Sequence, residues 1–249
     1  MTTTGTGATG AAHFTLQGKG GVGKSLVASI LAQYFEDHGS TPTCIDTDPI
    51  NQTLTSFKAL KATYLPVQAK DSSRVDERKF DILIRQILSK EGNFVIDNGA
   101  STFIALSNYL LEHNALQFLR EASRNVFIHV VVTGGQGMLE TLDGFRALAQ
   151  ANAPQSIIVW LNEYFGPIEY HDKTFVEMKV FLENADKVRG IVRIEKRNAD
   201  TFGHDMLQMA THKKTFAEVL QDPEWELMAR QRVRMIQREL YEQIDQLGL

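Results

Sequence analysis

The chain has 249 residues, of which 43% are hydrophobic, and its 26 basic and 30 acidic side chains give a formal net charge of −4. This size suits one large α/β domain, and the charge makes no case for tight nucleic-acid binding, although it leaves room for a local basic patch. The single cysteine, Cys44, excludes an internal disulfide and argues against a cysteine-ligated metal site, and it fits a buried thiol in a reducing compartment.

Residues 1–11 are small and polar and lack the basic and apolar parts of a secretion signal, so we expect a disordered tail before a single domain at 12–249. No apolar run reaches the roughly 20 residues that span a bilayer. Along the chain we expect, in order, strand 13–17, helix 25–35, strand 43–46, helix 54–60, strand 64–68, helix 76–89, strand 93–97, helix 102–121 broken near 113–114, strand 125–133, helix 138–149, strand 156–162, helix 174–184 and strand 188–194.

Strands and helices therefore alternate. This order predicts an α/β fold with one doubly wound, mostly parallel sheet that is covered by helices on both faces. The run 125–133 is the most strand-like and is expected to be a fully buried central strand.

A long C-terminal helix is expected at 223–247, with Pro223 at its first position. One stripe of this helix is apolar, formed by Ala229, Val233, Ile236, Leu240, Ile244 and Leu247. Another face carries Arg230, Arg234 and Arg238, interspersed with glutamates. This basic face is either a solvated side of a docked helix or a surface for a partner protein or DNA phosphates.

The segment from Gly18 to Ser25 fits G-x-x-x-x-G-K-[ST], the phosphate-binding loop of nucleotide hydrolases, and lies between an expected strand and an expected helix. Glycines let successive backbone N–H groups turn toward anionic oxygens, and the following helix adds the positive end of its dipole. A chance glycine-rich turn is disfavoured by the complete match and by its two flanking elements. The predicted nucleotide-binding residues here are Gly18, Lys19, Gly20, Gly21, Val22, Gly23, Lys24, Ser25 and Leu26.

Within this loop, Lys24 is expected to reach the β- and γ-phosphates, and the Ser25 hydroxyl to ligate Mg²⁺. Acidic residues follow two of the expected strands, Asp46 and Asp48 after one and Asp97 after another. Ligands of open parallel sheets bind beyond the carboxyl ends of the strands, so we expect these acids to serve magnesium and the attacking water. The alternative is that Asp46 and Asp48 only form a polar turn.

Two further features bear on the site. Gly99, just after Asp97, is placed to let backbone N–H groups approach the γ-phosphate, and Asn162 ends another apolar strand on the same side. Asn162 either reads a nucleotide base edge or forms a turn, and the sequence leaves both open. The histidines show no metal-ligand spacing, so we interpret them as structural or exposed.

Together these residues resemble the deviant Walker A ATPases of the partition and septum-positioning (ParA/MinD) superfamily, whose signature is K-G-G-V-G-K-[ST]. The resemblance extends over about 13–245 to the TraL proteins of conjugative plasmids and to StbB-type plasmid-stability proteins. It is carried by Phe14–Ser25, Cys44–Pro49, Ile96–Ser101, Val131–Gln136 and Val159–Asn162.

The resemblance implies a bacterial cytoplasmic ATPase that uses ATP and Mg²⁺ and acts in DNA transfer or in plasmid stability and positioning. It implies that ATP closes two subunits into a homodimer, that Lys19 crosses to the nucleotide of the second subunit, and that Asp48 orients the hydrolytic water. Asp46 and Asp97 would hold magnesium in the outer shell. Hydrolysis would be slow without a partner protein, and the resemblance leaves open whether that partner is bound to DNA.

The chain departs from the partition ATPases at two places. Those proteins usually continue Asp-Pro-Gln-Gly-Asn, whereas this chain has Asp48-Pro49-Ile50-Asn51, and they usually have Pro-Pro or a similar pair where this chain has Asn98-Gly99. The γ-phosphate switch is therefore expected to differ. Other classes remain as alternatives: a non-catalytic, nucleotide-regulated binding module and a ligase on the same fold. A dinucleotide dehydrogenase is disfavoured because that fold needs neither Lys24 nor Ser25.

Overall fold

A seven-stranded sheet forms the centre of the computed structural model, which describes residues 10–70, 72 and 74–249. All neighbouring strands pair in parallel, in the order β3-β2-β4-β1-β5-β6-β9. The strands are β1 (Ala11–Thr15), β2 (Thr43–Asp46), β3 (Thr63–Tyr64), β4 (Phe94–Asp97), β5 (Asn125–Thr133), β6 (Ile157–Asn162) and β9 (Val188–Ile194), and a separate hairpin is formed by β7 (Glu169–Tyr170) and β8 (Lys173–Thr174).

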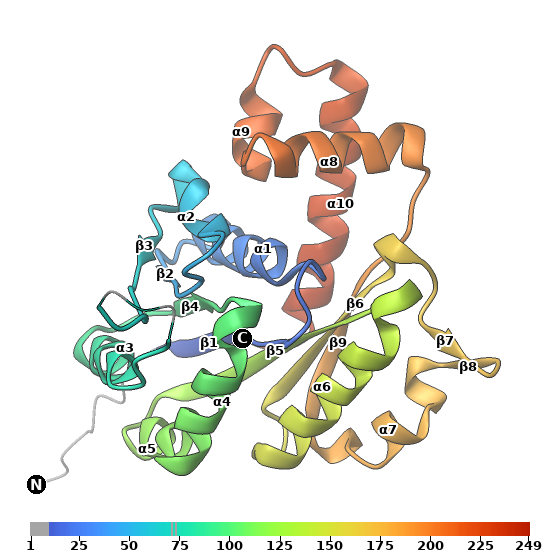
Figure 1. Ribbon diagram of the computed structural model, residues 1–249. Helices are drawn as coiled ribbons and strands as arrows, with labels where there is room; N and C mark the ends of the chain where they lie inside the picture. Colours follow the sequence, from blue (N-terminus) through green and yellow to red (C-terminus); the bar gives the residue numbers. More distant parts are fainter. Residues whose placement is uncertain (1–9, 71, 73) are drawn as a thin grey trace, which may run out of the picture.

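Helices cover both faces of the sheet (Figure 1). One face packs against α3 (Lys79–Ser89), α4 (Phe103–Glu112), α5 (Ala115–Glu121), α6 (Met138–Ala151) and α7 (Lys179–Leu182). The other face packs against α1 (Lys24–Asp37), α2 (Thr53–Ser56) and α10 (Leu227–Asp245), with α8 (His204–Thr211) and α9 (Phe216–Gln221) beside the upper part of α10. The predicted doubly wound α/β fold with a C-terminal helix is confirmed.

Alternate side chains of each strand enter opposite cores. Phe14 and Ile128 lie in the core beneath α3 to α6, while Val95 and Trp160 lie in the core beneath α1 and α10. Because both faces are covered, the strands are apolar almost throughout. This continuous apolar pattern is why β5 could be predicted from the sequence. Every residue of β5 after Asn125 is buried, and β5 has a neighbour on each side, as predicted.

Several predicted elements differ from the structure. The predicted tail falls mainly on residues 1–9, outside the described residues, but Ala11 already lies in β1, so that boundary is wrong. The predicted strand 64–68 is wrong in extent, because β3 contains only Thr63 and Tyr64. Gln68 instead forms an isolated antiparallel β-bridge with Val75. The predicted helix 54–60 is interrupted at Phe57, whose extended backbone directs its ring into the core.

The predicted helix 174–184 is also wrong in extent, because only Lys179–Leu182 is α-helical. A capping box between Thr174 and Glu177 closes a separate 3₁₀ turn before α7. Short segments of this kind obtain their conformation from local side-chain bonds, which compete with a continuous helix.

The C-terminal helix begins at Leu227 and not at Pro223. Asp222 accepts a hydrogen bond from the Glu224 N–H at 2.9 Å and pairs with Lys214, which holds a turn in which Trp225 is buried. The predicted apolar stripe is buried as expected, and its last member, Leu247, lies two residues beyond the end of α10.

The predicted basic face of α10 is only partly exposed. Arg234 and Arg238 are exposed, Arg238 pairs with Glu242 at 3.1 Å, and Arg230 is half-buried. Among the described residues, no helix is long and apolar enough to cross a membrane.

Candidate functional site

The sheet brings the predicted site residues together at one edge. The strand order places β1 between β4 and β5, and Asp97 is in register with both Thr15 and Asp46. The segment 18–25 follows β1, and Asn162 ends β6 on the same side. Residues from four separated parts of the chain therefore meet at the carboxyl ends of the strands, where ligands of open α/β sheets bind.

The loop at 18–25 requires glycine at two positions. Gly21 has φ 75° and Gly23, which precedes α1, has φ 106°, conformations that other residues adopt only with strain. A side chain on Gly23 would also meet the Asn162 amide at 3.0 Å. Such left-handed residues between strand and helix form the concave run of N–H groups that binds anions.

Gln17, which the sequence analysis missed, fixes the start of this loop. Its Nε2 donates to the carbonyls of Val131 and Thr141 at 2.9 and 3.1 Å, and its Oε1 accepts from the Gly18 N–H at 2.9 Å. The side chain is almost fully buried. The available signal in the sequence was a polar residue at the end of an apolar strand, directly before the glycine-rich loop.

The Lys24 ammonium is held inside the loop. Its Nζ donates to the Lys19 carbonyl at 2.9 Å, and the residue is only 7% exposed. Burial lowers the pKa of Lys24, whereas the nearby Asp97 and Asp48 carboxylates act in the opposite direction. The buried cation thus faces the acidic side of the site.

Lys19 points elsewhere. Its Nζ pairs with Glu140 Oε2 at 2.8 Å, in the first turn of α6, and both side chains are more than a third exposed. Glu140 was missed because it lies 121 residues away along the chain. An exposed pair of this kind contributes at most about 1 kcal/mol, so Lys19 is readily released.

Asp97 has the strongest signs of a metal-related role. Its Oδ1 accepts from the Thr15 hydroxyl at 3.0 Å, and its buried Oδ2 has no partner among the described residues. Burial raises the pKa of Asp97 to about 7, partly offset by the hydroxyls of Ser25 and Thr15. An unpaired carboxylate oxygen beside Ser25 and Lys24 fits a hydrated Mg²⁺ that accompanies a triphosphate, since Mg²⁺ prefers oxygen ligands and retains waters.

Asp46 and Asp48 form a tight turn. The Asp46 carboxylate accepts from the N–H groups of Asp48 at 2.9 Å and Thr55 at 3.2 Å, and burial raises its pKa. Asp48 accepts from the Ile50 N–H at 2.9 Å and the Asn51 amide at 3.1 Å. Asp46 therefore bonds the backbone on both sides of this turn, and Asp48 is fixed at the edge of the site.

Asn98, which stands where partition ATPases usually have a proline, connects the ends of β2 and β4. Its buried Oδ1 accepts from the hydroxyls of Thr47 at 3.1 Å and Thr102 at 2.7 Å. Gly99 follows with φ −69°, so it is not selected for a left-handed conformation. A side chain there would lie 2.5 Å from Asp48 Cγ, so Gly99 is needed because the Asp48 carboxylate packs against it.

We therefore expect Gly99→Ala to displace the Asp48 carboxylate, because contacts near 2.5 Å are not tolerated. Because the family resemblance implies that Asp48 orients the hydrolytic water, the variant should retain ATP affinity within about threefold and lose at least about tenfold in ATP turnover, as a misplaced catalytic group costs one to two orders of magnitude. Fluorescent-nucleotide titration and phosphate release would measure the two quantities. Gly203→Ala is the matched control for added bulk away from the site, because Gly203 has φ −64° and its new Cβ would lie 3.4 Å from its nearest neighbour, the Asn198 carbonyl oxygen. Wild-type turnover by Gly99→Ala would contradict this role.

Asn162 is bonded to the loop and to its own turn. Its Nδ2 donates to the Val22 carbonyl at 2.9 Å, and its Oδ1 accepts from the Tyr164 N–H at 3.2 Å. These bonds support the turn-forming interpretation in this conformation. Base recognition by Asn162 stays a prediction.

Two histidines lie in the core. The Trp160 indole N–H donates to His129 Nδ1 at 2.9 Å, and His129 Nε2 lies 3.0 Å from His13 Nδ1. Within residues 10–70, 72 and 74–249, no cluster of three or more histidine, cysteine, aspartate or glutamate side chains is placed to hold a metal. Cys44 is buried as expected, and burial raises its pKa to about 12.

The fold and this edge define a P-loop nucleotide-binding protein, and comparisons with known proteins agree. The CobQ/CobB/MinD/ParA nucleotide binding domain matches residues 14–231. A TraL protein of Escherichia coli is 44% identical over 234 residues, which cover 94% of this chain and 96% of the relative.

Two solved structures share the fold. A chain of the MinC:MinD cell division protein complex of Aquifex aeolicus matches with a TM-score of 0.54 at 14% identity, covering 93% of this chain and 96% of its own. A ParA family ATPase from Chlorobium tepidum TLS matches with a TM-score of 0.51 at 14% identity, covering 97% and 99%. The chain belongs to the CobQ/CobB/MinD/ParA nucleotide-binding family and, within it, is related to TraL, as its sequence motifs predicted.

Proposed function

We propose that this protein is an ATPase that closes into a homodimer around ATP·Mg²⁺ and reopens on slow hydrolysis, so that nucleotide state controls the binding of a partner protein. The supporting observation is the edge itself, where a phosphate loop with two lysines faces the Asp97 and Asp48 carboxylates. Lys24 and the loop would hold the triphosphate, with Ser25, Asp46 and Asp97 on the metal side. Bound Mg²⁺ would neutralise phosphate charge, and Asp48 would orient the water.

Exposed apolar side chains around this edge support dimerisation. Ile104 in the first turn of α4 is 69% exposed, and other large apolar residues follow β2, β5 and β6. These residues are Ile50, Leu139, Tyr164 and Phe165. Apolar surface that surrounds a polar site is typical of a protein interface. A second subunit would cover it and bring its own Lys19 to the nucleotide.

The direct test is mass by light scattering with ATP, ADP or no nucleotide, in magnesium. We expect the mass to double only with ATP. Asp48→Ala should remain dimeric with ATP and lose hydrolysis, whereas Lys19→Ala should bind ATP and remain monomeric. Normal dimerisation by Lys19→Ala would show that Lys19 has no cross-subunit role. Repeating the mass measurement with GTP tests the base preference.

A second pair of variants tests the surface. Ile104→Asp should prevent the ATP dimer while nucleotide affinity stays unchanged, because it places a charge in the buried interface. Leu111→Asp is the matched control, since Leu111 is also exposed on α4 but lies seven residues away, about 10 Å along the helix. If both variants affect ATP-dependent dimerisation equally, the surface around the loop is not the dimer interface.

One observation favours a second candidate, a nucleotide-regulated binding module without hydrolysis. Both oxygens of Asp48 already accept hydrogen bonds, from Ile50 and Asn51. If phosphate release is absent with and without a partner while ATP still causes dimerisation, this second function is correct.

The relationship to TraL suggests the biological setting. We propose that the partner belongs to the apparatus of conjugative plasmid transfer or plasmid stability, and that the protein acts in the bacterial cytoplasm. Whether the partner is bound to DNA, or whether this protein also contacts DNA, is open to a binding assay with each nucleotide.

A further inference from the structure

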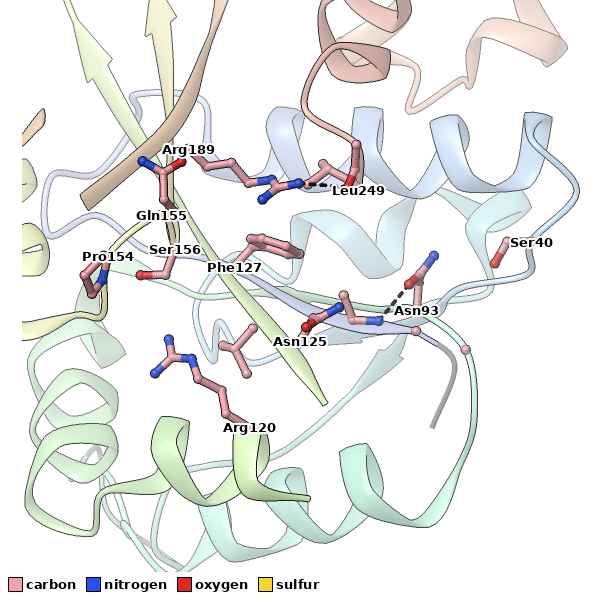
Figure 2. Close-up of a pocket in the computed structure, with 15 residues that line it drawn as sticks. Ser40, Asn93, Arg120, Asn125, Phe127, Pro154, Gln155, Ser156, Arg189 and Leu249 are labelled. Carbon is pink, nitrogen blue, oxygen red and sulfur yellow. Dashed lines mark hydrogen bonds between the residues drawn. The ribbon is translucent and has the colours of Figure 1, made fainter. Parts of the chain in front are cut away.

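A cavity lies at the opposite end of the sheet from the nucleotide loop. It has a volume of about 550 Å³ and is formed at the amino ends of β1, β5 and β6 together with the last residues of the chain (Figure 2). Cavities of a few hundred Å³ accommodate small organic molecules. No residue of the proposed ATP site lines this cavity.

The side-chain charges of this cavity have one sign, and the terminal carboxylate of Leu249 also lies at its wall. Arg120 from the end of α5 and Arg189 from β9 are the only charged side chains among its described lining residues. Figure 2 shows Arg120 reaching from its helix toward Ser156, with Phe127 between the two arginines. No aspartate or glutamate among the described lining residues neutralises the pair.

Arg120 has an unmet hydrogen-bonding requirement. Its Nη2 is buried and has no partner among the described residues, and burial lowers the pKa of the guanidinium. A buried charged donor without an acceptor is unfavourable, so such groups are usually paired. The neighbouring Arg124 is better paired, because its Nη1 donates to the Gly92 carbonyl at 2.9 Å and its Nη2 to the Ile87 carbonyl at 2.8 Å, which leaves only its Nε without a partner among the described residues.

Arg189 is held in place at the cavity wall. Its Nε donates to the Leu247 carbonyl at 2.7 Å and its Nη2 to the Gly248 carbonyl at 3.1 Å, and the guanidinium lies 5.3 Å from the centre of the Phe127 ring. These contacts orient the planar group. Its Nη1 makes no bond within the described part of the chain. A fixed guanidinium loses less entropy when it binds an oxyanion than a mobile one does.

We propose that this cavity binds a small organic anion, whose carboxylate or phosphate monoester oxygens pair with the guanidinium groups that line it, those of Arg120 and Arg189. Guanidinium groups present planar donors that match both kinds of oxyanion. The side-chain amides of Asn125 and Gln155, which also line the cavity, supply further polar contacts for the rest of the molecule.

Isothermal titration with succinate and with glycerol 3-phosphate tests this site and distinguishes the two anion classes. We expect at least one of them to bind the wild type saturably, and Arg120→Gln and Arg189→Gln each to weaken it about tenfold or more, as loss of a charge-assisted hydrogen bond does. The titrations include saturating ADP and Mg²⁺, since the loop at 18–25 also suits phosphate. If the measured affinity depends on Arg120 and Arg189, the anion binds in this cavity.

Two controls complete the experiment. Arg146→Gln removes an exposed arginine of α6 that pairs with Asp143 at 2.6 Å, and it should leave the affinity unchanged. Arg120→Lys keeps the charge and should bind more tightly than Arg120→Gln, which separates anion binding from a folding defect. Absence of saturable binding by both probes, or equal affinity in the Arg120→Gln/Arg189→Gln double variant, would overturn the proposal.

Discussion

Lys24→Ala is expected to lower nucleotide affinity by at least about a hundredfold, because a lysine bonded to phosphate supplies charge-assisted hydrogen bonds worth roughly 3 kcal/mol. Lys24 is already buried, and its Nζ is bonded to the Lys19 carbonyl at 2.9 Å. The ammonium thus needs little rearrangement to exchange a carbonyl for a phosphate oxygen. Titration with a fluorescent ATP analogue measures the loss.

The matched control for this variant is Lys90→Ala, which removes an exposed lysine between α3 and β4. Its affinity for ATP should equal that of the wild type. Circular dichroism establishes that both variants are folded. If Lys24→Ala binds ATP with wild-type affinity, the loop at 18–25 is not the phosphate site.

Acid is expected to unfold this protein because two buried histidines must remain neutral in the folded state. Burial lowers the pKa of His13 from 6.5 to about 3 and places that of His129 well below 6.5. The Trp160 N–H donates to His129, so His129 donates to His13, and the remaining His13 N–H has no partner among the described residues.

The sign of the pH dependence follows from the protons bound in each state. Below pH 6.5 the unfolded chain protonates both histidines and the folded protein does not, so stability is full above 6.5 and falls as the pH decreases toward 3. Each histidine contributes a slope of about 1.4 kcal/mol per pH unit. Asp97 opposes this, because its raised pKa makes the folded state hold a proton that the unfolded chain releases above 3.8.

The measurement is the free energy of unfolding in urea at several pH values between 7.5 and 4.5. His13→Leu should reduce the slope below pH 6 by about 1.4 kcal/mol per unit, since one proton uptake is removed. Phe127→Leu is the control, because Phe127 stacks on His13 but does not titrate. It should lower stability equally at every pH. An unchanged slope in His13→Leu would mean that His13 is not neutral in the fold.

The sequence predicted those parts of the fold that depend on local pattern. The continuous apolar run of β5 and the glycine-rich start of α1 were both recognisable because each has a strong signal within a few residues. Helices α8 and α9 were missed, since eight and six residues are too few to be stable without packing on α10. Only the capping box of Thr215 with Glu218 signalled α9.

In the site, too, the residues that belong to a local sequence motif were predicted, and those that depend on distant contacts were not. Lys24 and Asp97 were named because each belongs to a motif, and the fold places both at one edge. Asn98 and Glu140 were not assigned their contacts, since the partners Thr47 and Lys19 lie 51 and 121 residues away. Such pairs become predictable only when the order of the strands is known.

Contacts of Gly99 connect the Asp48 carboxylate to the start of α4. Asp48 packs against Gly99, whose carbonyl accepts from the Thr102 hydroxyl at 3.1 Å, and Ile104 follows two residues later on the surface. In the proposed ATPase, a change at Asp48 on hydrolysis would have only this short path to the first turn of α4. The second subunit, proposed to cover Ile104, would then respond to hydrolysis without touching the phosphates.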